Sequence, residues 1–230
     1  MGLLASKDTN NDKEMAFDFH FPTSKKALLI FTRNPELGKV KTRLAKTVGN
    51  QSALDIYNFL IQHTVEITKD LNVDKFVFYS DEIRKDDAWD SNIFRKRLQS
   101  GNDLGERMQQ AFEEILCMGY QMAIIIGSDM FNWKKSDLGM AFDQLSNHSI
   151  IIGPATDGGY YLMGMKELHP QLFKNKKWGS DQVLQQTIKD LSNVDYILLE
   201  ERNDVDIYED IMDEPAFQKF FPASLTKRTS

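Results

Sequence analysis

The chain has 230 residues, of which 41% are hydrophobic and 27% are charged, a composition typical of a globular protein with one large or two small domains. Its 28 basic and 34 acidic side chains give a formal net charge of −6, which argues against a general nucleic-acid-binding protein because such proteins need a basic face. The single cysteine excludes a disulfide within the chain, and no apolar run approaches the roughly 18 residues that span a membrane. We therefore predict a cytoplasmic protein.

The first 24 residues are polar and of mixed composition, and we predict that they form a flexible extension before a single domain of residues 25–230. This domain opens with an apolar, β-branched run, Lys26–Thr32, which predicts a strand buried on both faces. The strand ends before Asn34 and Pro35, which are turn residues.

A loop that contains Gly38 follows the strand and carries four cations. These cations are Arg33, Lys39, Lys41 and Arg43. A buried strand that leads into a glycine-containing basic loop is how α/β proteins hold phosphates at the carboxyl ends of their strands, and the alternative is a solvated basic loop. The spacing matches neither the Rossmann dinucleotide motif nor the P-loop. A basic loop in an acidic protein suits a small polyphosphate.

Helices and strands alternate along the rest of the chain. We predict helices at 50–71, 103–120, 136–148 and 180–191, and strands at 75–80, 92–99, 122–126, 150–153, 160–165 and 196–199. The most apolar strand, 122–126, is expected at the centre of the sheet. This alternation predicts an α/β fold with a mainly parallel sheet in three layers. The strand 160–165 follows its predecessor after too short a gap for a parallel crossover, so we expect it to be antiparallel or outside the sheet.

Two acidic segments could hold a cation. Asp129 follows the predicted central strand, and the carboxyl ends of such strands carry ligand-binding side chains in open α/β sheets. A carboxylate there can bind Mg²⁺, which in turn holds a diphosphate, although Asp129 could instead cap a helix. The acidic run 203–211 follows the last strand and offers Asp206 as a second metal ligand; the alternative is a solvated, acidic helix start.

A glycine-rich segment, 153–164, predicts a tight turn that a ligand can approach closely. Asp157 is expected at the tip of this turn, before Gly158 and Gly159, although Asp-Gly is also an ordinary hairpin signal. Tyr160 and Tyr161 are expected to face opposite sides of an extended segment, so that one of them can line a pocket.

Four further residues are interpreted from their positions in the sequence. Trp178 is either a stacking platform for a ligand or a core residue. Ser180 or Asp181 is expected to cap the helix that follows it. Cys117 lies within a predicted helix and is expected to be a buried, unreactive thiol.

Six sequence blocks, in this order, resemble those of the bacterial DUF2064 family, which includes proteins assigned as glycosyltransferases of arsenosugar biosynthesis. The blocks are FTRNPELGKVKTRL, GNDLGERMQQAF, IIGSDM, GPATDGGYYLMG, WGSDQV and NDVDIYEDI, and the resemblance covers roughly Lys25 to Phe221. The family in turn resembles the nucleotide-diphospho-sugar transferase superfamily with the GT-A fold, whose relatives include molybdopterin and phospholactate nucleotidylyltransferases.

The resemblance implies a transferase that depends on Mg²⁺ or Mn²⁺ and moves a sugar from a nucleotide-diphospho-sugar to a small-molecule acceptor. The alternatives are a nucleotidylyltransferase, which releases pyrophosphate, and a non-catalytic nucleotide-binding protein. The implied nucleotide ligands are Arg33, Gly38, Lys39, Lys41, Arg43, Asp103 and Arg107; the metal ligands are Asp129 and Asp206; and the sugar or acceptor residues are Gly158, Gly159, Tyr160 and Trp178. For an inverting transfer, Asp157 or Asp181 is the candidate base.

The sequence departs from the family pattern after Asp129. Family members often read S-D-C-P, whereas this chain has Met130 and Phe131 in place of Cys-Pro. The carboxylate is kept, but the path of the loop is left open. Ile207 and Tyr208 similarly replace a Thr-Pro pair in the late acidic block.

Overall fold

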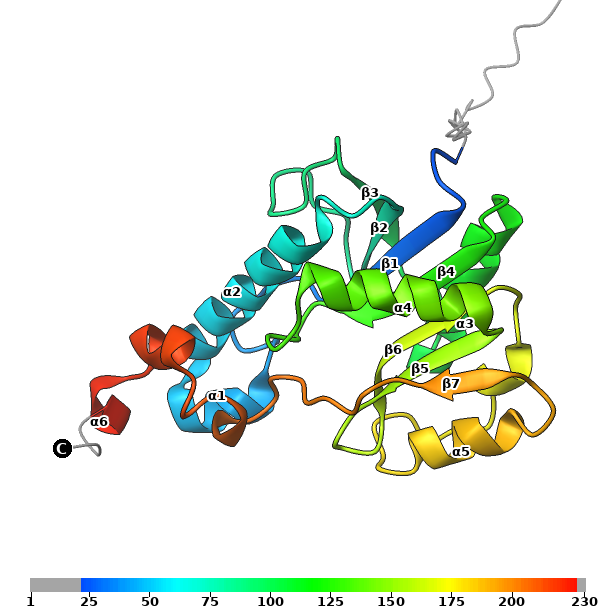
Figure 1. Ribbon diagram of the computed structural model, residues 1–230. Helices are drawn as coiled ribbons and strands as arrows, with labels where there is room; N and C mark the ends of the chain where they lie inside the picture. The colour runs from blue at the N-terminus through cyan, green and yellow to red at the C-terminus, as the bar shows by residue number, and fades with distance from the viewer. Residues whose placement is uncertain (1–21, 227–230) are drawn as a thin grey trace, which may run out of the picture.

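Seven strands form one sheet in the computed structural model, which describes residues 22–226 (Figure 1). The strands are β1 (Lys26–Thr32), β2 (Asp74–Tyr79), β3 (Phe94–Leu98), β4 (Met122–Gly127), β5 (Ile150–Pro154), β6 (Tyr160–Met165) and β7 (Tyr196–Leu198). Their order in the sheet is β3-β2-β1-β4-β6-β5-β7, so the strand predicted to be central is central. Residues 1–21 of the predicted extension lie outside the described residues, and the domain division stays a prediction.

The sheet is mainly parallel. β1 runs parallel to β2 and β4, β2 to β3, and β5 to β7. β6 lies within the sheet and is antiparallel to both β4 and β5. The reason is the five-residue connection before β6, which is long enough for a reversal but too short for a crossover. The predicted α/β fold is therefore confirmed, and the position of β6 is settled.

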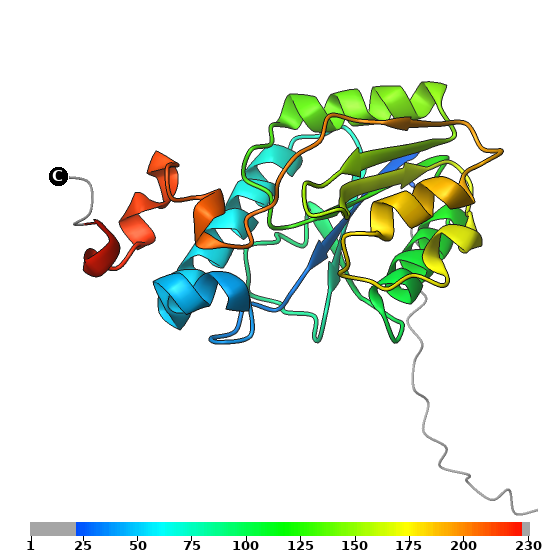
Figure 2. The ribbon, with the colours of Figure 1, turned by 90° about the horizontal axis from the view of Figure 1, so that it is seen from below.

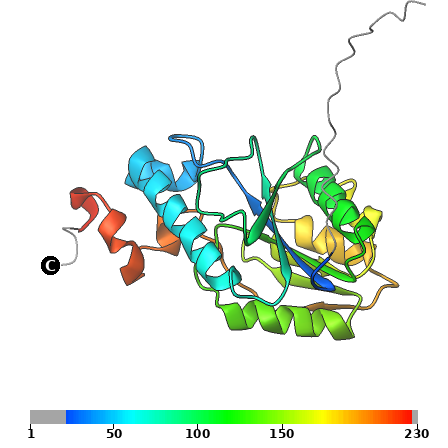
Figure 3. The same cartoon turned by 90° about the horizontal axis from the view of Figure 1, so that it is seen from above.

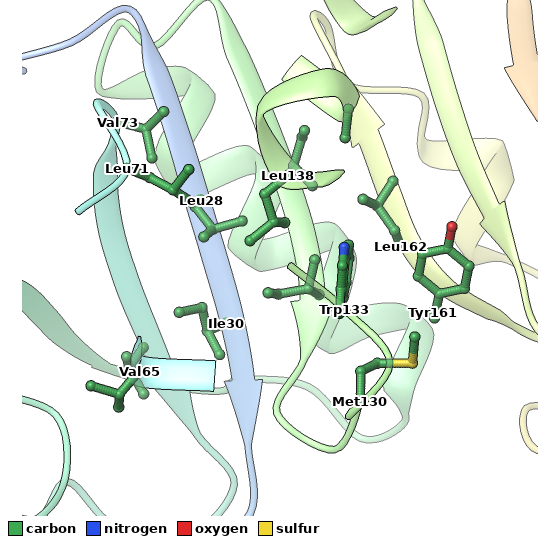
Figure 4. Close-up of a cluster of buried hydrophobic side chains, with 14 of the residues drawn as sticks. Leu28, Ile30, Val65, Leu71, Val73, Met130, Trp133, Leu138, Tyr161 and Leu162 are labelled. Atoms are coloured by element: carbon green, nitrogen blue, oxygen red, sulfur yellow. The ribbon is translucent and has the colours of Figure 1, made fainter. Parts of the chain in front are cut away.

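Helices cover both faces of the sheet (Figures 2 and 3). They are α1 (Thr42–Val48), α2 (Asn50–Thr68), α3 (Leu104–Cys117), α4 (Lys135–Asn147), α5 (Val183–Asp190) and the short α6 (Ala223–Thr226). Alternate residues of β1 explain the three layers: Leu28 and Ile30 pack toward α2 and α4, whereas Ala27 and Leu29 pack toward α3. Figure 4 shows Leu28 and Ile30 with Trp133, Leu138 and Leu162 in the first of these cores.

The C-terminal segment, residues 205–225, forms a third core with α1 and α2. Ile211, Phe217 and Phe221 pack with Leu44 and with the α2 residues Ile56 and Leu60. The 3₁₀ helix Pro215–Phe220 carries Phe217 and is followed directly by Phe221, while Ile211 directly follows the 3₁₀ helix Tyr208–Asp210. Neither α1 nor this packing follows from the sequence pattern, because each element is too short to show a helical period.

Two local predictions were wrong. Cys117 is exposed because it lies off the face of α3 that carries Met108, Phe112 and Ile115. α5 begins only at Val183 and has no side-chain cap, so neither Ser180 nor Asp181 caps it. Asp103 does cap α3, since its carboxylate accepts a hydrogen bond of 2.8 Å from the Glu106 amide. Within residues 22–226, no helix is both long and apolar enough to cross a membrane.

Gly139→Ala is expected to stabilise the protein by about 0.5–1 kcal/mol. Gly139 lies inside α4 without a positive φ, and a Cβ added there meets nothing within 4 Å. Alanine restricts the unfolded chain more than glycine does and costs nothing in this position. Urea denaturation of the variant and the parent measures the difference. A lower midpoint for Gly139→Ala would contradict the open environment described for this residue.

Candidate functional site

Lys41 and Asp129 meet at the carboxyl end of the sheet. Because β1 and β4 are adjacent and parallel, the loops that follow them start side by side. The Lys41 Nζ lies 2.9 Å from Asp129 Oδ2, and the side chains are 7% and 34% exposed. Lys41 has a left-handed backbone with φ of 47°, an uncommon conformation for a residue other than glycine. We call residues 33–43 the basic loop, although its last cation, Arg43, lies in the first turn of α1 and not in the predicted loop.

A second ion pair joins the basic loop to the acidic run of residues 203–211. Arg43 pairs with Asp206. The Asp210 carboxylate holds the backbone around Asp206 in place, because it accepts hydrogen bonds of 2.8 and 2.7 Å from the amides of Asp206 and Ile207. The Val205 amide donates to the Asp129 carbonyl at 3.2 Å. The structure thus brings the two predicted metal ligands to one edge of the sheet, each beside a cation of the basic loop.

Asp204 belongs to the same group of charges, although no site role was predicted for it. Burial, followed by the negative charge of Asp129, raises the pKa of Asp204 to about 6. Burial also opposes the charges of Lys41 and Asp129, but their ion pair outweighs it, so the pKa of Lys41 is raised and that of Asp129 is lowered. The sequence could not distinguish Asp204 from Asp206, because the segment has no regular period that shows which side chains face inward.

The donor chemistry of this group fits a hard divalent cation, since Asp129, Asp204 and Asp206 supply only carboxylate oxygens. However, no three acidic, histidine or cysteine side chains among the described residues are arranged so as to hold a metal ion. A metal here would be held by one or two carboxylates and by oxygens of a substrate, as is usual for Mg²⁺. The metal assignments of Asp129 and Asp206 stay predictions.

A buried hydroxyl network fixes the ends of β1 and β4 to α2. The Arg33 amide donates to the Tyr57 hydroxyl at 2.8 Å, and this hydroxyl lies 3.1 Å from Ser128 Oγ. Ser128 Oγ donates in turn to Thr32 Oγ1 at 3.0 Å. Burial raises the pKa of Tyr57, so its phenol stays protonated and can donate. The network immobilises the residues that precede Asp129 and the start of the basic loop. Tyr57 falls at a core position of a helical pattern, which hid this role.

Tyr57→Phe is expected to lower the free energy of unfolding by about 1–3 kcal/mol, because the Arg33 amide and the Ser128 hydroxyl lose a buried partner while the ring is kept. Urea denaturation measures the loss. The matched control is Tyr196→Phe in β7, since the Tyr196 hydroxyl has no hydrogen bond within the described part of the chain. If both variants were equally stable, the hydroxyl network would not be a structural element.

The remaining nucleotide candidates of the basic loop lie at its outer side. Arg33 is exposed, and Gly38 adopts a φ of 75° that favours glycine. Lys39 is 73% exposed and pairs with Glu36 at 2.6 Å. Asn34, expected only as a turn residue, is 3% exposed, and its Oδ1 accepts hydrogen bonds from two amides of the loop after β2. The base of the basic loop is therefore fixed, while Arg33 and Lys39 face outward.

Asp103 lies between β3 and α3, and Arg107 lies in the first turn of α3. Asp103 is the cap of α3, and Arg107 donates to the Gly101 carbonyl at 3.2 Å and to Gln99 Oε1 at 3.3 Å. Gln99 reaches the Thr32 carbonyl at 3.4 Å, which links this segment to the end of β1. Arg107 also lines a cavity of about 440 Å³, and Asp204 lines a separate cavity of about 290 Å³.

The glycine-rich segment forms the predicted turn. Asp157 is exposed at its tip, and its Oδ1 accepts a hydrogen bond of 2.9 Å from the Gly159 amide. Gly158 has a φ of 85° and lies against the backbone of Asp181, while its carbonyl accepts a hydrogen bond of 2.9 Å from the Leu184 amide. The two candidate bases, Asp157 and Asp181, are thus on touching segments, and both are exposed.

Tyr160 and Trp178 form an aromatic wall beside this turn. Their rings are perpendicular, with centroids 6.5 Å apart, and Trp178 also packs against Gly105, where an added Cβ would lie 2.4 Å from the indole. Burial raises the pKa of Tyr160. Tyr161 points to the opposite face, packs edge-on against Trp133 at 5.2 Å, and donates to the Glu200 carbonyl, which confirms the predicted alternation.

The departure after Asp129 has a structural explanation. Met130 is only 2% exposed, and the Phe131 ring packs edge-to-face against Phe217 at 4.8 Å and lies 5.8 Å from Phe59. These aromatic contacts to α2 and to the C-terminal segment set the path of the loop. The Met-Phe pair therefore keeps the carboxylate of Asp129 at the edge of the sheet.

The comparisons with known proteins agree with this architecture. The family model described as "Uncharacterized protein conserved in bacteria (DUF2064)" matches residues 64–180, just over half of the chain. A solved candidate nucleotide-diphospho-sugar transferase from Desulfovibrio desulfuricans G20 is 28% identical, with a TM-score of 0.75 and coverage of 89% of this chain and 94% of the other. No curated protein matches the chain significantly.

A more distant structure shares the fold alone. It is the 4-diphosphocytidyl-2C-methyl-D-erythritol synthase from Anaerococcus prevotii DSM 20548, at 7% identity and a TM-score of 0.53, with coverage of 85% of this chain and 97% of the other. The resemblance seen in the six sequence blocks is thereby confirmed at the level of family and fold, and the link to arsenosugars stays a prediction. The sheet, the loops at its carboxyl edge and the family model lead to one assignment: the chain belongs to the DUF2064 family.

Proposed function

We propose that the chain is a transferase that uses a nucleotide-activated substrate, and that it moves a sugar from a nucleotide-diphospho-sugar to a small-molecule acceptor. The observation that carries the proposal is the Lys41–Asp129 pair at the carboxyl ends of β1 and β4. The same basic loop carries further cations. The solved relative from D. desulfuricans, itself a candidate nucleotide-diphospho-sugar transferase, supports it.

In this proposal the basic loop binds the diphosphate. Arg33 and Arg43 are exposed cations, Lys41 is a buried one, and all three follow the end of β1. Fixed cations stabilise the charge that develops on a departing diphosphate. Asp129 and Asp206 would hold Mg²⁺ or Mn²⁺, which when bound neutralises part of the same charge.

The acceptor would bind on the other side of Asp129, against the turn of residues 157–159 and the wall of Tyr160 and Trp178. Asp157 or Asp181 would accept the proton of the acceptor hydroxyl, since both are exposed carboxylates next to this turn. Gly159 adds no side chain to the turn, so that a sugar can approach the backbone there.

Calorimetric titration with UDP-, GDP- and dTDP-sugars and with the matching nucleoside triphosphates, with and without Mn²⁺, tests the proposal. We expect Mn²⁺-enhanced binding of one nucleotide sugar, followed by release of the nucleoside diphosphate on incubation with acceptors. Preference for a triphosphate, with pyrophosphate release, would instead indicate a nucleotidylyltransferase. Binding without transfer or hydrolysis would indicate a non-catalytic protein, and no binding at all would refute the nucleotide site.

A further inference from the structure

We propose that Lys41 is a built-in counterion that blocks the metal position at Asp129 until the phosphates of a nucleotide draw it away, so that divalent metal binds tightly only together with nucleotide. This inference rests on the proposed function. It concerns the order in which the site is filled, which neither the fold nor the family resemblance specifies.

The blocking contact is the ion pair between Lys41 and Asp129. The ammonium lies 2.9 Å from the carboxylate oxygen and is almost fully buried, whereas the carboxylate keeps 34% of its surface exposed. The charges of Asp204 and Asp206 also act on Lys41. A divalent cation that approached Asp129 would therefore meet a buried positive charge that already neutralises the carboxylate. Like charges held this close in a poorly solvated place repel strongly.

The second predicted ligand is covered in the same way, because Arg43 from the same loop pairs with Asp206. The two cations that cover the metal ligands are also two of the cations proposed to bind the diphosphate. Phosphate oxygens can thus take over both cations and free both carboxylates in a single event. An ammonium is a point charge on a flexible stem, so Lys41 can exchange a carboxylate for a phosphate without a change of fold.

The backbone explains why Lys41, rather than another lysine, takes this position. Its backbone is left-handed, with φ of 47°, and its side chain is directed inward onto Asp129. Lys39, two residues earlier, is 73% exposed and pairs with Glu36 on its own loop. Lys39 thus carries the same charge on the same loop but has no contact with Asp129, which makes it a matched control.

The coupling is reciprocal by thermodynamic necessity. If a nucleotide raises the affinity for metal by some factor, metal raises the affinity for that nucleotide by the same factor. Removing the Lys41 ammonium should therefore increase the affinity for metal alone and weaken the coupling, whereas removing the Lys39 ammonium should leave the affinity for metal alone unchanged.

The first test titrates the full chain with Mn²⁺ alone and measures free Mn²⁺ by electron paramagnetic resonance. We expect Lys41→Met to bind Mn²⁺ about tenfold or more tightly than the parent, and Lys39→Met to bind like the parent. Adding Asp129→Asn to Lys41→Met should abolish the gain. Equal Mn²⁺ affinity in Lys41→Met and the parent would overturn the proposal, and so would an equal gain in Lys39→Met. Lys41→Gln and a thermal melt guard against a folding defect.

The second test repeats the titration with UDP, GDP and dTDP, after subtracting the Mn²⁺–nucleotide complex measured without protein. A nucleotide that binds should raise the Mn²⁺ affinity of the parent more than that of Lys41→Met. An equal increase in both proteins would overturn the coupling. Failure of the proposed function gives a different result. No nucleotide would then bind, but Lys41→Met would still bind Mn²⁺ alone more tightly than the parent.

Discussion

Asp129→Asn is expected to abolish metal-dependent nucleotide binding while the protein remains folded. Asparagine keeps the shape of aspartate but lacks the charge that a hard cation favours. Loss of one partner of such a charge pair costs on the order of 2 kcal/mol or more, so we expect the nucleotide affinity in Mn²⁺ to fall by about 30-fold or more. The melting temperature should fall by only a few degrees, because Asp129 is 34% exposed and Asp204 and Asp206 remain near Lys41.

Two further variants control this experiment. Asp206→Asn should act in the same direction but more weakly, because its partner Arg43 is 64% exposed and water can solvate both groups. Asp143→Asn, on the outer face of α4 with its side chain 80% exposed, should bind nucleotide like the parent. If Asp129→Asn bound nucleotide and Mn²⁺ like the parent, or unfolded far earlier, Asp129 would be a structural residue and not a metal ligand.

Gly158→Ala is expected to destabilise the protein by about 2–4 kcal/mol, more than an alanine at Gly119 or Gly139. Gly158 has a φ of 85°, and an added Cβ would lie 2.1 Å from the Asp181 carbonyl oxygen, which belongs to backbone and cannot swing away. The turn of residues 157–159 would have to move off the segment before α5. We expect the melting temperature to fall by about 5–15 °C and transfer activity to fall with it.

Gly119→Ala separates strain from collision. Gly119 has a similar φ of 95°, but a Cβ there meets nothing within 4 Å, so only the conformational cost of about 1–2 kcal/mol applies. Thermal melts of the two variants measure the difference. Should Gly158→Ala melt at the same temperature as Gly119→Ala, the close packing of the turn against Asp181 would be wrong.

Most of the fold could be predicted because the apolar patterns are strong. The buried runs of β1 and β4 indicated positions inside the sheet, and the short gap before β6 excluded a parallel crossover, leaving an antiparallel strand or one outside the sheet. The parts of the fold that could not be predicted are those with weak local patterns. α1 has only seven residues, and the C-terminal segment is stabilised by aromatic contacts to α2 that no local pattern reveals.

The candidate site was predictable in position but not in pairing. Parallel neighbouring strands bring the ends of β1 and β4 together, so the basic loop and Asp129 were expected at one edge. That Lys41, rather than Lys39, reaches Asp129 depends on a left-handed residue, which has no sequence signal outside glycine. The hydroxyl of Tyr57 was hidden for a related reason, since its ring satisfies the helical pattern of a core residue.

The central claim is that a nucleotide diphosphate binds between the basic loop and Asp129. Its most direct test is a crystal structure of the chain grown with Mn²⁺ and the nucleotide that binds most tightly in calorimetry, with the anomalous signal of manganese used to locate the metal. We predict a manganese peak at Asp129, the diphosphate against Arg33 and Arg43, and Lys41 Nζ on a phosphate oxygen. A diphosphate bound elsewhere, with the Lys41–Asp129 pair still closed, would contradict the claim.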